Sequence, residues 1–583
     1  MIARLISICV LALLFVQGAS AFVFSRTGNG SVRHWELVNL NPFVHTNVVN
    51  PATHAVRYFL ASDGYSSTNT TAELNALRAS FDQWQLVSGT TLKFEDAGLV
   101  APGVDINTSD NRNVLFFAKS STIVNGGTSD ISGRLGVTFT SFFSDGTFAE
   151  ADIVFNGVEA QWFTDFSSTN RTLNFMEGTA LHEIGHFIGL AHSPIGGASM
   201  LWIGDKGVDT QAGLSADEIA AVRAAYPTAA QIASLGALKG TITKNGSPVL
   251  GAAVVLESAG NAVAGAVSRS TGAYEFSALP PGNYQVRVVP LDPNFSSGIL
   301  VRGPDIGSEF NAADTTFLPT ANTAVVVTAG ATNTLDFALQ NSSPAFRIGY
   351  IRAPTANAGA FSWSPYPTSL KPGATNITLG VASGNLPTSA ASLTISGDGL
   401  TVGTPTFNPN AFGTGLNFIS VVVSVATNAT PGLRTLTVQQ GANTAHANGY
   451  LEILPQNPDY DFDGLADTFQ RQYFARFTLA EADPNADPDG DTFINSSEYR
   501  AGTSPTNSSS FLKIETVTTS ISGATVVWRS VSGKRYQMYF KPVLTASTWS
   551  PVGSTITASS ATAQQLDPAG ASGMRFYRVE VLP

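Results

Sequence analysis

Cysteine is almost absent from this chain of 583 residues, since the only one is Cys9, close to the amino terminus. A mature protein without cysteine has no disulfide bonds, so its domains must depend on the size of their cores and on bound ions. The chain is also too long for a single hydrophobic core, and three to five domains are the natural expectation.

Charged residues are scarce as well, at 13% of the chain, and the formal net charge is −11. This negative balance argues against nucleic acid or an anionic membrane surface as the main partner. Glycine, serine, threonine, alanine and valine are abundant instead, a composition that suits secreted β-rich modules.

Long apolar runs are missing after residue 21, so we expect no transmembrane segment in the mature chain. Residues 1–21 have the features of a secretory signal: Arg4, an apolar run at 5–16 and the small residues Ala19-Ser20-Ala21. The apolar run is shorter than the ~20 residues of a spanning helix, which favours cleavage over an N-terminal membrane anchor. We therefore predict a secreted, extracellular protein from which Cys9 is removed.

Three of the seven histidines fall within eleven residues, His182 to His192, which read HExxHxxGxxH. His182 and His186 are four apart and lie on one face of a helix, where two imidazoles can hold one zinc ion. Gly189 can end that helix with a positive φ, so that the chain returns and offers His192 as the third nitrogen ligand. The fourth position stays open for water, as in catalytic zinc sites. Histidines in helices are often only packing or surface residues. The motif fixes the residue type at five positions, however, so a zinc site is the stronger interpretation.

This stretch resembles the metzincin metallopeptidases, and Ser193, directly after the third histidine, is the residue that matrixins carry. Met200 stands where matrixins place their Met-turn. Residues 214–227 look like the matrixin C-terminal helix, and 81–94 are similar to the first helix and second strand of the family. The resemblance covers most of 50–228 and implies an α+β catalytic domain.

The resemblance has limits. Animal matrixins have a second, structural zinc site built from further histidines, and the histidines outside the motif do not supply one. The cysteine-switch propeptide is also missing, because no cysteine is available. We interpret His34 and His45 as surface histidines rather than as ligands that block the zinc.

A zinc peptidase mechanism follows for these residues. Zinc held by three neutral histidines lowers the pKa of its bound water, and Glu183 takes up that proton as general base. Met200 is expected to form an apolar floor. The substrate would lie extended along 134–140, with Gly133, Gly136 and loop 203–213 shaping the cleft, and Leu181 would contribute to the specificity pocket.

Hydrophobic spacing predicts the elements of this domain. Helices are expected at 71–87, 175–190 and 215–226, the last with a capping box formed by Ser215 and Glu218. The predicted strands are 55–60, 91–94, 114–117, 135–140 and 151–155. Asp130, Glu150 and Asp152 are either a structural calcium site or ordinary carboxylates.

The fold class is therefore multidomain: an α+β metzincin catalytic domain, then all-β sandwich domains and a calcium-loop segment. After a linker at 228–236, residues 237–341 resemble the carboxypeptidase-regulatory-like β-sandwich, whose usual role is that of a spacer or adhesion module. Residues 345–454 are interpreted as an immunoglobulin-like β-sandwich. The predicted domains are 1–21 signal peptide, 22–228 metallopeptidase, 237–341 and 345–454 sandwiches, 457–507 calcium repeats and 511–583 a C-terminal β domain.

The segment 457–507 has acidic residues in a regular order. Between 459 and 498 there are ten acidic residues and only two arginines. Without a cation, the carboxylates of this segment would repel one another. The spacing fits calcium loops, and the segment resembles thrombospondin type 3 or dockerin-like repeats. The alternative is a solvated acidic linker. The predicted calcium ligands are Asp459, Asp461, Asp463 and Asp467 in the first loop, and Asp487, Asp489, Asp491, Asn495 and Glu498 in the second.

Together these features predict a secreted zinc-dependent endopeptidase that hydrolyses peptide bonds of extracellular proteins. Its cofactors would be catalytic Zn²⁺ and structural Ca²⁺, and its partners protein or peptide substrates. Its β domains are candidates for contact with a cell surface or polysaccharide. The alternative is a surface-associated adhesion or binding protein whose metallopeptidase-like domain is inactive or secondary.

Overall fold

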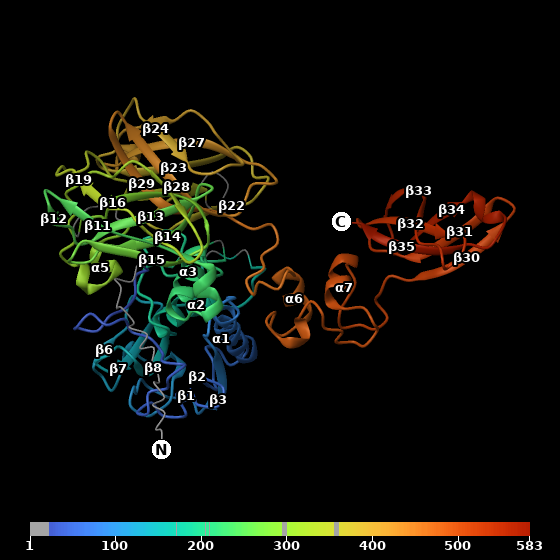
Figure 1. The fold of residues 1–583 in the computed structure, drawn as a ribbon, viewed down its shortest axis with the longest axis horizontal. Helices are drawn as coiled ribbons and strands as arrows, with labels where there is room; N and C mark the ends of the chain where they lie inside the picture. Colours follow the sequence, from blue (N-terminus) through green and yellow to red (C-terminus); the bar gives the residue numbers. More distant parts are fainter. Residues whose placement is uncertain are drawn as a thin grey trace, which may run out of the picture. The chain divides into compact units, whose positions relative to one another are not determined.

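We describe the chain from a computed structural model, and the residues described are 22–582 except 169, 171, 205, 209, 294–299 and 355–360. The predicted signal segment, with Cys9, lies outside the described residues. The chain divides into two compact units, and Figure 1 labels helices and strands of both. The first unit comprises Met1–Ser62, Ser88–Trp162 and Thr169–Pro455, and the second comprises Asp63–Val87, Phe163–Ser168 and Gln456–Pro583.

The amino-terminal part of the first unit is built on a mixed sheet of order β1-β2-β4-β8-β7, with β3 also paired to β2. Strands β2, β4 and β8 are parallel, whereas β7 is antiparallel to β8 and forms an edge. The second expected strand begins later than predicted, because only Phe94 of the stretch 91–94 is extended in the sheet. The strands are β1 Val49–Asn50, β2 Ala55–Ala61, β3 Phe94–Val100, β4 Val114–Ala118, β7 Gly136–Phe142 and β8 Phe148–Asn156.

Helices follow this sheet in the chain. The motif helix α2 spans Met176–Phe187, and α3 spans Ala216–Ala225 with the predicted Ser215–Glu218 capping box. The predicted linker 228–236 is partly helical, because the Thr228 hydroxyl caps α4 (Ala229–Ser234) by accepting from the Gln231 amide at 3.2 Å. Four short strands complete this part: β5 Ile123–Val124, β6 Ser129–Asp130, β9 Trp162–Phe163 and β10 Asn174–Phe175.

The segment before the sheet packs onto the end of α2. Phe24 forms an antiparallel bridge with Leu190, and the Ser25 amide donates to the Gly189 carbonyl at 2.8 Å. The indole N–H of Trp35 donates to the Phe187 carbonyl at 2.9 Å. These three interactions hold the end of α2 and the turn that follows it, so this segment is part of the folded domain.

The first β-sandwich follows at Gly236. One sheet contains β12-β11-β15 with β18 and β19 paired to β11, and the other has the order β14-β13-β16-β17. Its strands are β11 Gly236–Lys244, β12 Ser247–Pro248, β13 Ala252–Ser258, β14 Asn261–Val267, β15 Ala273–Leu279, β16 Gly282–Pro290, β17 Thr323–Val327, β18 Thr332–Thr334 and β19 Phe337–Leu339. Between β16 and β17 lie the short helix α5 (Gly303–Ile306) and the 3₁₀ turn η1 (Ser308–Phe310).

A second two-sheet sandwich completes the first unit, with sheet orders β21-β20-β23-β27-β25 (β26 also on β27) and β22-β29-β28-β24. A turn η2 (Ala411–Gly413) precedes β27. Its strands are β20 Tyr350–Pro354, β21 Phe361–Ser364, β22 Thr368–Leu370, β23 Ile377–Ser383, β24 Ser392–Ile395, β25 Leu400–Val402, β26 Thr406–Asn408, β27 Asn417–Val425, β28 Gly432–Gln440 and β29 Asn443–Ile453.

The second unit combines helix α1 (Thr70–Gln85) with the acidic segment and the carboxy-terminal strands. The acidic segment contains α6 (Asp467–Tyr473), η3 (Ala480–Ala482) and α7 (Asn495–Ala501), and the Asp82 carboxylate on α1 accepts from the Thr478 hydroxyl at 2.6 Å. The final β domain has two three-stranded sheets around buried Trp528 and Tyr536. Its elements are β30 Ile514–Ser520, β31 Gly523–Arg529, β32 Arg535–Lys541, β33 Ser550–Thr557, β34 Thr562–Asp567, η4 Pro568–Ala571 and β35 Phe576–Leu582.

Among the described residues, no helix has the length and apolar character needed to cross a membrane.

Candidate active site

The histidine motif forms a helix followed by a sharp turn. His182 and His186 lie one turn apart on α2, and the helix ends at Phe187. Gly189 has φ +100°, and the Leu190 amide donates to the Gly185 carbonyl at 2.9 Å. A side chain at Gly189 would overlap the Arg33 carbonyl. Glycine therefore permits both the backbone conformation and the close approach of the amino-terminal segment.

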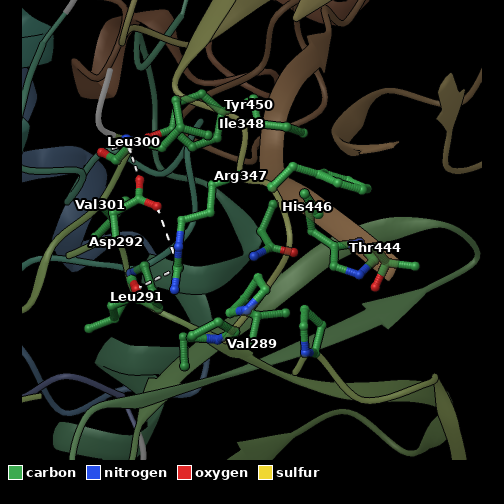
Figure 2. Close-up of a pocket in the computed structure, with 18 residues that line it drawn as sticks. Val289, Leu291, Asp292, Leu300, Val301, Arg347, Ile348, Thr444, His446 and Tyr450 are labelled. Atoms are coloured by element: carbon green, nitrogen blue, oxygen red, sulfur yellow. Dashed lines mark hydrogen bonds and ion pairs between the residues drawn. The ribbon is translucent and has the colours of Figure 1, made fainter. Parts of the chain in front are cut away.

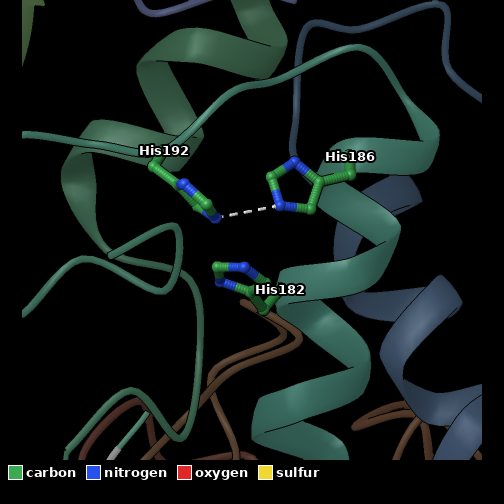
Figure 3. Close-up of side chains that lie close together, drawn as sticks. All are labelled: His182, His186 and His192. Atoms are coloured by element: carbon green, nitrogen blue, oxygen red, sulfur yellow. Dashed lines mark hydrogen bonds between the residues drawn. The ribbon is translucent and has the colours of Figure 1, made fainter. Parts of the chain in front are cut away.

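The turn brings the third histidine back to the first two. Ring nitrogens of His182, His186 and His192 all lie within 4.8 Å of one another, and the rings converge on one point (Figure 3). The Nε2 atoms of His186 and His192 are 3.2 Å apart. Two nitrogens bound tetrahedrally at the usual zinc distance would be about 3.3 Å apart, so this spacing fits zinc.

The other ring nitrogen of each histidine is occupied. The Nδ1–H groups of His182 and His186 donate to the carbonyls of Ser199 and Leu190, each at 2.8 Å, and that of His192 donates to the Asp305 carbonyl. In this tautomer all three Nε2 atoms present lone pairs to the same point. Two facing lone pairs repel, so the arrangement favours a shared cation.

Burial also keeps these imidazoles neutral, as metal ligands must be. It lowers the pKa of His182 to about 3, with a further contribution from the charge of His186. Burial likewise lowers the pKa of His186 and that of His192. Their geometry, tautomers and charge state together fit a zinc ion with three nitrogen ligands.

Glu183 points from α2 toward strand β7. It is 4% exposed, and its Oε2 atom accepts from the Thr138 hydroxyl at 2.7 Å. Burial raises the pKa of Glu183 to about 7, whereas the Thr138 hydrogen bond and the Arg134 charge oppose the shift. A Cβ at Gly136 would lie 2.8 Å from the Glu183 side chain, so glycine at this position leaves room for the carboxylate.

Ser193 and Met200 belong to one loop that a main-chain hydrogen bond closes. The Ser193 amide donates to the Met200 carbonyl at 2.7 Å, and the Met200 amide donates to the Glu218 carboxylate at 2.9 Å. Met200 is 2% exposed. It does not belong to the nitrogen cluster and is a packing residue, as expected from its place in the motif.

A cleft of about 720 Å³ opens over the histidines, within the range of ligand pockets in proteins. Its walls include Gly133, Gly136 and residues of the predicted loop 203–213. Leu181, predicted for the specificity pocket, does not line this cleft: it is 0% exposed because its side chain points into the core behind α2. Trp202 and Ile203, in the segment after Met200, do line it.

The first acidic loop brings carboxylates of Asp459, Asp461 and Asp467 within 4.8 Å of one another. Asp463 is outside this group, because its Oδ2 atom accepts from the Gln470 amide at 2.8 Å. Burial and the neighbouring aspartates raise the pKa of Asp461 to about 7. The charges in this loop therefore oppose one another without a counterion.

The second acidic loop gathers Asp487, Asp489 and Asp491 in the same way. Asn495 and Glu498 follow on α7 and are 0% and 1% exposed. Neither carboxylate oxygen of Glu498 makes a hydrogen bond of standard geometry within the described residues, although the Thr503 hydroxyl lies near enough to act on its pKa. Burial raises the pKa of Glu498 to about 7; the Thr503 hydroxyl opposes this shift, and the three aspartates add to it.

The two loops share one backbone conformation. In the first, Asp459 accepts from the amides of Asp463 and Gly464, and in the second Asp487 accepts from those of Asp491 and Thr492, all at 2.9–3.2 Å. The fourth and sixth positions have positive φ in both loops: Phe462 (63°) and Gly464 (92°) in the first, Gly490 (75°) and Thr492 (80°) in the second. The same fold thus recurs although the glycine changes position.

The other acidic candidates do not form such a group. Both oxygens of Asp152 accept main-chain amides, from Val114 at 2.8 Å and from Asn107 at 2.9 Å. Glu150 likewise accepts from the Asn111 amide at 2.7 Å. These carboxylates hold the loop before β4, and Asp130 does not join them in a metal-type cluster of the described residues.

A second cavity lies between the two sandwiches and measures about 60 Å³ (Figure 2). Asp292 accepts from the Leu300 amide at 2.8 Å and faces Arg347 at 3.8 Å, and the Tyr450 hydroxyl donates to the Leu300 carbonyl at 3.1 Å. This space suits a few water molecules that solvate a buried ion pair.

Sequence reasoning missed three groups near the histidines. The Thr138 hydroxyl, the amino-terminal segment around Ser25 and the Asp305 carbonyl all contact the motif. Of these three, only Thr138 could have been found from the sequence, since it lies in the strand predicted to run beside the substrate. The other two depend on pairing between segments far apart in the chain.

Two family descriptions match this chain. Residues 52–227 match Matrixin, and residues 237–296 match Carboxypeptidase regulatory-like domain. The first match supports a metallopeptidase domain that carries the histidine cluster. No curated protein sequence matches the chain.

Among solved structures, the chain is similar to the minor pilin GBS52 of Streptococcus agalactiae at 15% identity, over 22% of this chain and 48% of that one, with a TM-score of 0.14. It is also similar to the 5-hydroxyisourate hydrolase of Klebsiella pneumoniae at 21% identity, over 18% of this chain and 87% of that one, with a TM-score of 0.13. The chain spans about half the length of the pilin.

Proposed function

We propose that this chain is a secreted zinc-dependent endopeptidase that hydrolyses peptide bonds of extracellular proteins. The observation that carries the proposal is the convergence of three Nε2 lone pairs beside a buried carboxylate, Glu183, in an open cleft. The match of this segment to Matrixin supports the same reading.

The residues of the site have distinct roles in this reaction. Zinc, when bound by His182, His186 and His192, supplies a Lewis acid and lowers the pKa of water. Glu183 takes up a proton as general base and returns it to the leaving amine. Thr138 orients the Glu183 carboxylate through its 2.7 Å hydrogen bond. The unpaired side of edge strand β7 offers main-chain groups to an extended peptide.

We further propose that the two acidic loops bind calcium. Carboxylate oxygens are the ligands that calcium prefers, and buried charges without a counterion are costly. The buried Glu498 carboxylate follows a loop with three aspartates, which supports a ligand role for it. The shared loop conformation supports two sites of one kind.

Cleavage of casein or gelatin tests the enzymatic proposal. We expect the purified chain to cleave these proteins, to lose activity on removal of zinc and to regain it when zinc is returned. A zinc-loaded chain that cleaves no protein or peptide would instead support the alternative, an adhesion or binding protein with an inactive peptidase-like domain. Amino-terminal sequencing of the exported protein tests secretion, with Phe22 as the expected first residue.

A further inference from the structure

The third histidine differs from the other two in the origin of its hydrogen-bond partner. The Nδ1 atoms of His182 and His186 bond to carbonyls of Ser199 and Leu190, in the segment that matches Matrixin. The Nδ1 atom of His192 bonds to the carbonyl of Asp305, 113 residues further along and in α5 of the first sandwich. The sandwich therefore supplies one of the three groups that orient the ligands.

Helix α5 is itself held in a defined position. The Asp305 carboxylate accepts from the Arg302 amide at 2.9 Å and forms an ion pair with the Arg302 guanidinium at 2.8 Å. A Cβ at Gly303 would overlap the main-chain oxygen of Phe310 and lie 3.1 Å from Ala313. The short helix thus fits closely against the turn η1.

The loop that carries Ser193 is also held by the sandwiches. Asp217 on α3 is 5% exposed and accepts two hydrogen bonds, from the Ser193 hydroxyl at 2.6 Å and from the Gly265 amide of β14 at 2.7 Å. The Gly196 amide donates to the Asn448 carbonyl of β29 at 2.8 Å.

Hydrophobic packing joins the same elements. Ile195, Ala198 and Leu201 share one buried core with residues of both sandwiches, including Val255 and Leu433. A Cβ at Gly265 would lie 2.7 Å from the Pro194 ring, so the strand approaches this loop closely. The loop between the third histidine and Met200 is thus enclosed by the β domains.

We propose that α5 of the first sandwich is a positioning element for the metal site, holding His192 through the Asp305 carbonyl, and that it forms one wall of the substrate cleft. Pro304 and Asp305 line the cleft that contains the histidines, which places this wall beside the ligands. The sandwich is then part of the active site rather than a spacer. This inference rests on the proposed zinc peptidase function.

Metal binding by the full-length chain tests the proposal. Gly303→Ala should displace α5 and, through the outer partner of a ligand, lower zinc affinity about 10–100-fold. It should also shift the visible absorption bands of the cobalt-substituted chain, which report ligand geometry. Gly282→Ala, in β16 of the same sandwich, is the control, because its Cβ would meet only a ring carbon of Tyr284 at 3.8 Å.

A second variant, Arg302→Gln, loosens α5 without adding volume and is expected to reduce zinc affinity by a smaller factor. It decides the question if Gly303→Ala does not fold. Affinity and cobalt spectra equal to those of Gly282→Ala in every folded variant would overturn the proposal. A wild-type chain that binds no zinc would overturn the proposed function itself, which is a different outcome.

Discussion

The histidine cluster and the acidic loops each gather side chains that could hold a cation, yet the two groups differ in charge and in hydrogen bonding. The three imidazoles are neutral, and main-chain carbonyls fix each Nδ1 atom. The acidic loops gather charged carboxylates, and those of Asp461 and Glu498 have raised pKa values because they are buried near like charges. The first site is therefore preformed, whereas the second should depend on its cation for stability.

The largest expected effect is a loss of catalysis in a variant that keeps the three histidines of the preformed site. Glu183→Gln removes the general base but none of the histidines, so we expect peptide cleavage to fall about 10³-fold while zinc content is unchanged. Hydrolysis of a quenched fluorescent peptide and metal analysis measure the two quantities. Glu580→Gln, on β35 of the other unit, is the control and should retain full activity. Retained activity in Glu183→Gln would remove this residue from the mechanism.

The next effect concerns the acidic loops. With calcium at 100 times its dissociation constant, binding should stabilise the second unit by about 2.7 kcal/mol. Glu498→Gln should lose part of this stabilisation, yet be as stable as wild type or more stable without calcium, because a buried charge is gone. Thermal unfolding with and without calcium, at constant zinc, measures both.

Glu481→Gln serves as the control for this experiment. Glu481 lies in the same acidic segment, but it is exposed and outside both carboxylate groups. It should respond to calcium as the wild type does. Equal calcium responses of the Glu498 and Glu481 variants would contradict a ligand role for Glu498.

The sequence identifies the histidine cluster and the acidic groups more fully than the residues around them. The histidine motif is local: helical spacing and one glycine turn decide where its ligands lie, and the structure brings those three side chains together. The loop spacing similarly predicts the aspartate groups, apart from Asp463, which bonds to Gln470.

Long-range contacts set the rest, and they leave little trace in the sequence. The hydrogen-bond partner of His192 is the main-chain carbonyl of Asp305. Every residue has such a carbonyl, so the residue type at this position does not predict the contact. Leu181 neighbours a ligand in sequence, but its helical position turns it into the core. The sequence does not predict the short helix α4, because its small residues give only a weak hydrophobic periodicity. Thr228, a favourable N-cap residue directly before it, is the one signal for this helix.

A smaller effect is expected on the pH dependence of stability. It concerns Asp152, a carboxylate whose oxygens already accept hydrogen bonds, unlike the Glu498 carboxylate of the second acidic loop. Burial raises the pKa of Asp152 to about 6, although two main-chain amides bond to it. A folded-state pKa above the unfolded one near 3.9 means that protonation favours the folded form, so stability should rise as pH falls from about 7 to about 4. We expect Asp152 to contribute about 2 kcal/mol to this rise.

Unfolding by denaturant at pH 7 and pH 5 checks the sign. Asp152→Asn should be less stable at both values, since it loses an acceptor, but its stability should change less with pH. Calcium should not alter the contribution of Asp152, in contrast to the acidic loops. A wild-type chain that becomes less stable as pH falls over this interval, with the same slope in Asp152→Asn, would contradict the assignment.

The smallest expected effect is on the stability of the two acidic loops, which differ in the residue at their sixth position. Thr492 is exposed with φ +80°, at the position where the first loop has Gly464. Thr492→Gly should relieve roughly 1–2 kcal/mol of backbone strain but lose about 0.5–1 kcal/mol to the greater freedom of the unfolded chain. The net gain of about 0.5 kcal/mol should appear in thermal unfolding without calcium. Gly464→Thr, the reverse change in the first loop, should destabilise. If both variants shift in the same direction, the left-handed backbone at this position does not control the stability of the loops.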